Sequence, residues 1–84
     1  MTPRTPQNPK SQRALGSAIR ELRSKQGDSL EALAGKAGIT KNMLSLIERG
    51  EGNPSWVTVE GIAKALGVSV ASLAKLAETE SDPS

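Results

Sequence analysis

The chain has 84 residues, 11 of them basic and nine acidic, with a formal net charge of +2. This length fits one domain, and the absence of Cys, His and Tyr excludes disulfides, thiolate or histidine metal sites and nucleophile–histidine pairs. A single Trp cannot form an aromatic base-stacking platform. We also expect a cytoplasmic protein without a cofactor, because there is no signal-peptide core and no apolar run near the about 20 residues of a membrane span.

The two ends of the chain differ from its centre. Residues 1–10 contain three prolines and no apolar periodicity, which predicts a disordered arm, and residues 79–84 read as a polar acidic tail. Residues 11–78 are then the folded domain. Three of the nine acids lie in the last seven residues, so the rest of the chain carries 11 bases against six acids. This excess is a mild signal for a polyanionic partner, and an ordinary solvated surface explains it equally well.

Apolar residues recur at helical spacing in five segments, each bounded by a capping side chain or a glycine. The predicted helices are 11–26 before Gly27, a second capped by Asp28 or Ser29 and ended by Gly38, a third from the cap Thr40 to Arg49 before Gly50, a fourth capped by Ser55 and ended by Gly67, and a fifth capped by Ser69. No segment alternates with period two for long enough to form a sheet. The predicted fold class is therefore all-α, a five-helix bundle.

The second and third helices are separated by a short turn that contains Gly38. Two helices joined in this way form a helix-turn-helix unit. The unit requires a core-facing Leu33, a small Ala34 under the crossing helix and a left-handed turn at Gly38. The side chains expected to fill the space beneath the pair are Ile39, Leu44 and Ile47.

The third helix divides into two faces at about 100° per residue. Met43, Leu44 and Ile47 cluster on one of them. The other face carries two bases and no acid, and consists of Lys41, Asn42, Ser45, Leu46 and Arg49. Such a face could enter the major groove of DNA, although the same pattern is also that of a solvated face of an amphipathic helix.

Longer motifs resolve this alternative: IRELR in the first helix, LA…AGI, SLIERG, NPS, and IAKALGVS in the fourth helix. From Leu15 to Leu76 the chain resembles the Cro/C1-type (Xre family) helix-turn-helix domain. The resemblance implies a lambda-repressor-like bundle and a sequence-specific transcriptional regulator that reads operator DNA with its third helix, as a homodimer on a near-palindrome. The stretch KNMLSLIERGEGNPS is also similar to a subgroup that often carries a C-terminal cupin sensor domain.

The resemblance also implies a structural ion pair between Arg23 and Glu48, which orients Arg23 toward the phosphate backbone. For reading bases we expect Lys41 and Asn42 first and then Ser45, because these side chains match acceptors and donors on base edges. Leu46 touches a thymine methyl or lies at the edge of the core. The expected phosphate contacts, besides Arg23, come from Ser29, Thr40, Arg49 and Asn53.

Some positions depart from the family or have no fixed place in it. Many family members carry Gln at the first position of the second helix, where this chain has Leu30, so we expect Leu30 to pack instead, on Met43 for example. Trp56 is expected in the core or at a dimer rim. The resemblance suggests dimerisation through the fourth and fifth helices, where the apolar residues are Val68, Val70, Leu73 and Leu76.

Basic residues near the N-terminus, Arg4, Lys10 and Arg13, could add non-specific DNA contacts, although such termini are often idle. A second function class is an antitoxin or adaptor that binds mainly another protein, but the short polar tail argues against it. An enzyme is remote, given the missing residue types and the lack of a phosphate loop. No membrane partner or small-molecule ligand is evident.

Overall fold

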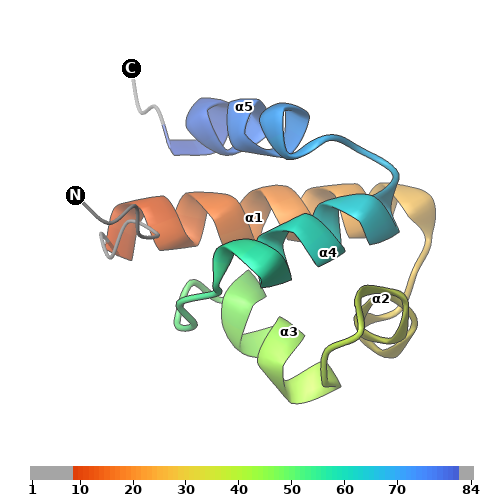
Figure 1. The fold of residues 1–84 in the computed structure, drawn as a ribbon. Coiled ribbons are helices and arrows are strands. Elements are labelled where there is room, and N and C mark those ends of the chain that lie inside the picture. Colours follow the sequence, from red (N-terminus) through yellow and green to blue (C-terminus); the bar gives the residue numbers. More distant parts are fainter. Residues whose placement is uncertain (1–8, 82–84) are drawn as a thin grey trace.

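A computed structural model describes residues 9–81 of the chain. It contains five helices: α1 (Pro9–Gln26), α2 (Leu30–Ala37), α3 (Lys41–Glu48), α4 (Trp56–Leu66) and α5 (Val70–Ser81). Figure 1 shows α1 running through the middle of the molecule, with α5 on one side of it and the α2–α3 pair on the other. The predicted all-α bundle is confirmed.

The two outer boundaries differ from the predicted ones. Helix α1 begins at Pro9 rather than at Ser11, since the fixed backbone angle of proline suits the first turn of a helix. Helix α5 continues to Ser81, past the predicted start of the tail at residue 79. The rest of the predicted arm, residues 1–8 with Arg4, and the rest of the tail, residues 82–84, lie outside the described residues.

The inner boundaries follow the predicted caps. Ser29, rather than Asp28, caps α2, and its side-chain oxygen accepts a hydrogen bond from the backbone N–H of Ala32 at 3.0 Å. The other three caps make the same bond to the residue three positions on: Thr40 to Met43 at 3.0 Å, Ser55 to Thr58 at 3.2 Å, and Ser69 to Ser72 at 2.9 Å. Each bond satisfies one backbone donor that the helix itself leaves unpaired.

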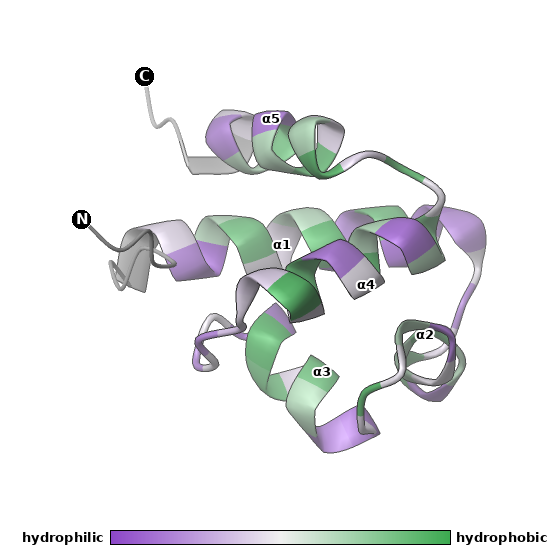
Figure 2. Cartoon of the chain, in the orientation of Figure 1, coloured by the Kyte–Doolittle hydropathy of each residue, from purple (hydrophilic) through white to green (hydrophobic). Residues whose placement is uncertain are grey.

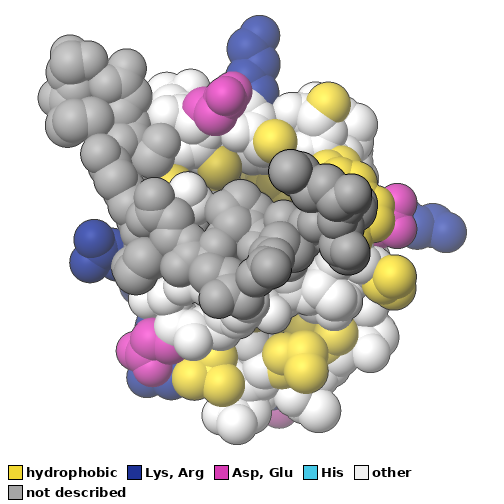
Figure 3. All heavy atoms as spheres, turned by 60° about the vertical axis from the view of Figure 1, so that its left-hand side comes forward, with side chains coloured by type: hydrophobic (Ala, Val, Ile, Leu, Met, Phe, Trp, Pro, Cys, Tyr) yellow, Lys and Arg dark blue, Asp and Glu magenta, His cyan; other side chains and the backbone are white. Residues whose placement is uncertain are grey.

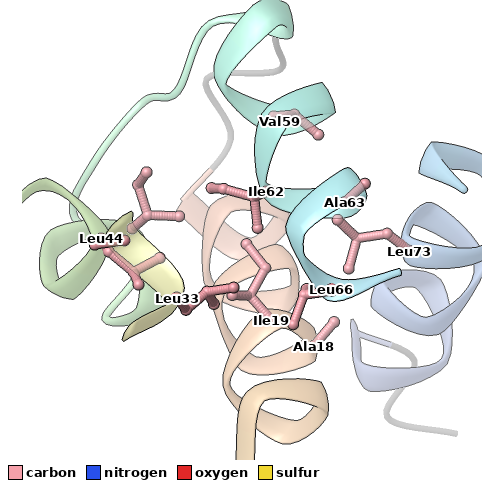
Figure 4. Packing of buried hydrophobic residues seen from close by; sticks show 11 residues of the cluster. Ala18, Ile19, Leu33, Leu44, Val59, Ile62, Ala63, Leu66 and Leu73 are labelled. Carbon is pink, nitrogen blue, oxygen red and sulfur yellow. The ribbon is translucent and has the colours of Figure 1, made fainter. Parts of the chain in front are cut away.

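One apolar core joins all five helices. Its fully buried large side chains are Ile19, Leu33, Leu44, Ile62 and Leu73. Figure 4 shows them converging from α1, α2, α3, α4 and α5, with Ile19 of the long α1 in the middle. In Figure 2 the hydrophobic residues lie toward the interior of the bundle and hydrophilic residues alternate with them around the outside, as expected for amphipathic helices.

The core uses two residues differently from the prediction. Leu73 was expected at a dimer surface, but it is only 1% exposed because α5 packs along α1 and buries it there. Trp56 was expected in the core or at a rim, and its 60% exposed side chain excludes the core.

The end of α1 is tied to the end of α4. The Gln26 side-chain amide donates a hydrogen bond of 2.6 Å to the backbone carbonyl of Leu66.

Among residues 9–81, no single helix has the length and apolar composition of a membrane span; α4 and α5 pass such a test only together, with a 94° bend between them.

Candidate DNA interface

Helices α2 and α3 form a helix-turn-helix with a three-residue turn. Gly38 has φ 74° and ψ 27°, the left-handed conformation that glycine adopts without a steric penalty. The chain turns back after Gly38, where the backbone N–H of Ile39 donates a hydrogen bond of 3.0 Å to the carbonyl of Ala34. Ala34 is 2% exposed, and Ile39 packs against the core. The predicted turn is confirmed.

Helix α3 presents a polar face to solvent. Leu44 and Ile47 are buried, whereas Lys41 and Asn42 are exposed. Ser45 and Leu46 are half-buried, and Arg49, the C-terminal cap, is exposed. The structure thus places the predicted base-reading residues on one outward face, with Lys41 and Asn42 the most accessible.

Met43 lies outside the core, contrary to the prediction. It is 45% exposed, since the buried arc of this eight-residue helix is narrow and is filled by Leu44 and Ile47. Leu30 is half-buried and packs against the core cluster, as its replacement of a polar residue suggested. Leu46 is half-buried without belonging to that cluster, which leaves one side of it accessible.

The charges of α3 are placed against its own dipole. Lys41 is its first residue, where the partial positive charge of the helix favours acids, and the helix has no acid in its first turn. Glu48 is its last residue, where the partial charge is negative. Each position costs about 0.3–1 kcal/mol in an isolated helix, so another interaction must favour these charges.

For Glu48 that interaction is with Arg23 of α1. The Arg23 Nε donates to Glu48 Oε2 at 2.7 Å and a terminal nitrogen donates to Oε1 at 3.0 Å. The two side chains are only 15% and 6% exposed. The hydrogen bond to Glu48 raises the pKa of Arg23, against the opposing effect of burial and with further attraction from Glu48 and Asp28. The structure therefore brings together the two residues of the expected ion pair.

Arg23 makes a third contact that reaches the other helix of the unit. Its remaining terminal nitrogen donates 3.0 Å to the backbone carbonyl of Asp28, just before α2. One guanidinium thus joins α1, the start of α2 and the end of α3. With all these groups satisfied at part-buried sites, Arg23 has limited freedom to turn toward a phosphate.

For Lys41 no compensating acid is present among residues 9–81. The ion pairs of the described residues lie elsewhere, and none includes Lys41. An ammonium at a helix N-terminus, next to unpaired backbone N–H groups, is a favourable place for an anion from outside.

The remaining expected phosphate contacts lie before and after the helices of the unit: Ser29 and Thr40 precede α2 and α3, and Arg49 and Asn53 follow α3. Ser29 and Thr40 are exposed caps whose oxygens accept the backbone bond, so each hydroxyl hydrogen is still able to reach an acceptor. Asn53 is exposed in the loop before α4. Arg49 lies 3.8 Å from Glu51, and both are more than half exposed, so their attraction is weak.

Gly16 is a buried residue of the contact between α1 and α3, which holds this interface in place, and the sequence analysis missed it. A Cβ at this position would lie 2.6 Å from the carbonyl oxygen of Glu48 and would also collide with that of Ile47. Helix α1 therefore approaches the end of α3 as closely as backbone allows. A glycine inside an otherwise regular helical pattern was the available signal.

Comparison with known proteins agrees with this geometry. Residues 14–76 match the profile of a family described as a helix-turn-helix domain. The chain belongs to this helix-turn-helix family. It is also 43% identical over 60 residues to the HTH-type transcriptional regulator SinR of Bacillus subtilis, covering 70% of this chain and 54% of SinR. The chain thus spans about half the length of this relative.

Two solved structures share the fold. The clp gene regulator ClgR of Corynebacterium glutamicum superposes with a TM-score of 0.82 and 32% identity, covering 84% of this chain and 76% of ClgR. The restriction-modification controller protein C.AhdI of Aeromonas hydrophila superposes with a TM-score of 0.72 and 34% identity, covering 74% of this chain and 94% of C.AhdI. This helix-turn-helix chain is a Cro/C1-type DNA-binding domain of the kind found in transcriptional regulators.

Proposed function

We propose that this helix-turn-helix domain regulates transcription by reading operator DNA with α3 in the major groove. The observation that carries the proposal is that one face of α3 is packed against the bundle while the opposite face is exposed to solvent. Leu44, Ile47 and the Arg23–Glu48 pair fix the helix to the bundle, while Lys41 and Asn42 project from its first turn. A rigid helix with free polar side chains at its N-terminal end suits base reading.

The residues of the interface have separate roles in this proposal. Asn42 bonds adenine at two atoms, Lys41 donates to guanine acceptors, and Ser45 and Leu46 contact the next base edges. Ser29, Thr40, Arg49 and Asn53 bind phosphates and set the register. Arg23 makes only a minor phosphate contact, because its nitrogens bind Glu48 and Asp28, and its main role is to hold α3 in place.

We further propose that the protein binds DNA as a homodimer on a near-palindrome, with half-sites about one helical turn, ~34 Å, apart. The domain measures 32 × 30 × 22 Å, so one copy covers about one half-site. A DNA reader shares a compartment with the chromosome, which supports a cytoplasmic location. The link to the subgroup that often carries a C-terminal cupin sensor domain rests on residues 41–55 alone. The gene tests this link, because a cupin domain encoded after this domain in the same reading frame would support it.

In vitro selection from random duplex DNA tests base reading directly. The chain should enrich a palindromic motif, and Asn42→Ala should relax the preference at a single symmetric pair of positions. Lys75→Ala, a change of an exposed residue on the distant α5, is the matched control and should enrich the original motif. Retention of DNA without any enriched motif would contradict sequence-specific reading.

A further inference from the structure

Helix α3 exposes a large apolar side chain that the core does not use. The exposed large hydrophobic residues between residues 9 and 81 are Met43 at 45%, Trp56 at 60% and Val57 at 75%. Figure 3 shows hydrophobic side chains at several places on one side of the molecule, next to charged ones, so exposure alone indicates no function. Met43 differs from the other two because it lies on the helix that we propose enters the major groove.

Met43 has an apolar neighbour on the same helix. Leu46 follows it by three residues, a spacing at which side chains of a helix meet. Leu46 is half-buried and does not belong to the core cluster. At about 100° per residue, Leu46 lies between Asn42 and Met43, on the side of α3 away from the buried Leu44. We call Met43 and Leu46 the apolar strip of α3, and this strip borders Asn42.

Hydrogen bonds fix the backbone on which the apolar strip is mounted. The Met43 N–H donates to the side-chain oxygen of the cap Thr40 at 3.0 Å. The Leu46 carbonyl accepts from the N–H groups of Glu51 at 2.9 Å and Gly52 at 3.2 Å. A fixed backbone lowers the entropy cost of binding at this place. The methionine side chain itself is flexible and polarisable, so it can adapt to an irregular apolar contact.

We propose that the apolar strip of α3 reads the 5-methyl group of a pyrimidine in the major groove. This inference rests on the proposed function and names the base feature that this part of α3 recognises. Among the four bases, only thymine presents a methyl group in the major groove, and 5-methylcytosine carries the same group at the same ring position. The side chains of the strip have no hydrogen-bond donor, and their one acceptor, the thioether sulfur, is weak. They therefore suit the methyl group, whereas Lys41 and Asn42 suit the polar atoms of the base edges.

The position of the strip relative to Asn42 predicts where this pyrimidine lies. Leu46 follows Asn42 by four residues, which is about 6 Å along the axis of α3, and successive base pairs are about 3.4 Å apart. The methyl group should therefore belong to a pyrimidine about one or two base pairs from the adenine that Asn42 reads. Burial of one methyl group corresponds to a gain of about 4-fold in affinity.

Four duplexes that differ at one pyrimidine test this inference. The motif obtained by selection supplies the half-site, and each position near the one that Asn42→Ala relaxes carries thymine, uracil, 5-methylcytosine or cytosine in turn. Thymine and uracil differ only by the methyl group, and so do 5-methylcytosine and cytosine. At one position the methylated member of each pair should bind about 4-fold more tightly. A gain in one pair alone identifies that base as the source of the methyl group.

Variants assign the effect to Met43. Met43→Ala shortens the strip and should bring the affinity ratio within each pair close to one, whereas Met43→Leu keeps a large apolar side chain and should keep the ratio. Val57→Ala removes apolar area from an exposed residue of α4, so it is the matched control and should leave the ratio unchanged. Because Met43 lies outside the core, urea unfolding of Met43→Ala should match that of the wild type.

The same titrations separate this inference from the proposed function. Equal affinities within both pairs at every position would overturn the reading of a methyl group and leave DNA reading intact. A ratio that Met43→Ala does not change would also overturn the inference. A wild-type chain that binds none of the four duplexes more tightly than an unrelated duplex would overturn sequence-specific reading, and this inference with it.

Discussion

Arg23 and Glu48 join the last turns of α1 and α3 through two hydrogen bonds of 2.7 and 3.0 Å. The fork of the guanidinium matches both carboxylate oxygens, so the pair fixes the orientation of α3 as well as its distance from α1. Because Arg23 also donates to Asp28, a rotation of α3 would disturb the start of α2. The pair therefore links the stability of the domain to the orientation of the exposed face of α3, which carries Lys41 and Asn42.

Glu48→Ala should lower both stability and DNA affinity. The change removes two hydrogen bonds to a charged group and leaves Arg23 partly buried without its partner, which costs about 1.5–3 kcal/mol. Urea unfolding and DNA titration measure the two losses. Glu51→Ala removes an acid from the exposed 3.8 Å pair with Arg49 and should change stability by only about 0.5 kcal/mol. Equal effects of the two changes would exclude a structural role for the Arg23–Glu48 pair.

Two glycine-to-alanine changes should have opposite signs. Gly16→Ala inserts a methyl group against the carbonyls of Ile47 and Glu48, so it should destabilise the domain by about 1–3 kcal/mol and displace α3. Gly35→Ala meets nothing within 4 Å in α2 and should stabilise it by about 0.5–1 kcal/mol. Thermal unfolding gives both values. A neutral Gly16→Ala would mean that α1 and α3 can separate without cost.

Local patterns were sufficient to predict the helices and their inner ends. The bond from each hydroxyl cap to a backbone N–H three residues on is formed within one helical turn, and so depends only on neighbouring residues. The same is true of the turn at Gly38. The helix-turn-helix could therefore be found from spacing alone, before any long-range contact was known.

Long-range packing decided what the sequence left open. Met43 lies at the apolar edge of a helical wheel, but no wheel tells how wide an arc the other helices cover. Leu73 and Trp56 are both apolar residues of the last two helices. The packing of α5 on α1 buries Leu73, whereas Trp56, at the start of α4, stays exposed. The close approach at Gly16 depends on a crossing between residues more than 30 positions apart.

Lys41→Ala should weaken DNA binding without weakening the fold. Removing a positive charge from the first turn of α3 relieves its unfavourable interaction with the helix dipole, so stability should stay equal or rise by about 0.3–1 kcal/mol. DNA affinity should fall, with a smaller dependence on salt if the contact is to phosphate. Titrations at several salt concentrations measure this, with Lys75→Ala as the control for overall charge. A loss of stability with unchanged affinity would assign Lys41 a structural role.

Two cap removals should separate capping from phosphate binding. Thr40→Ala and Ser69→Ala each delete a bond to a backbone N–H, and each should cost about 0.5–2 kcal/mol of stability. Thr40 begins α3, whereas Ser69 begins α5 on the other side of α1 (Figure 1). Only Thr40→Ala should also weaken DNA binding at temperatures where both variants are folded. Calorimetry and DNA titration check the two effects, and equal DNA affinities would remove Thr40 from the interface.

Leu30→Gln should exchange stability for DNA affinity. Leu30 is half-buried against the core at the first position of α2, where the resemblance to the Cro/C1-type family implies a glutamine that contacts DNA. The change should cost about 1 kcal/mol of apolar burial and add a donor at the interface. Leu22→Gln removes a half-buried leucine of α1 that also packs on the core, so it should cost a similar amount without any gain. Urea unfolding and DNA titration at low temperature compare the pair. If both variants bind DNA equally, the packing of Leu30 contributes to stability alone, and the readout depends on α3.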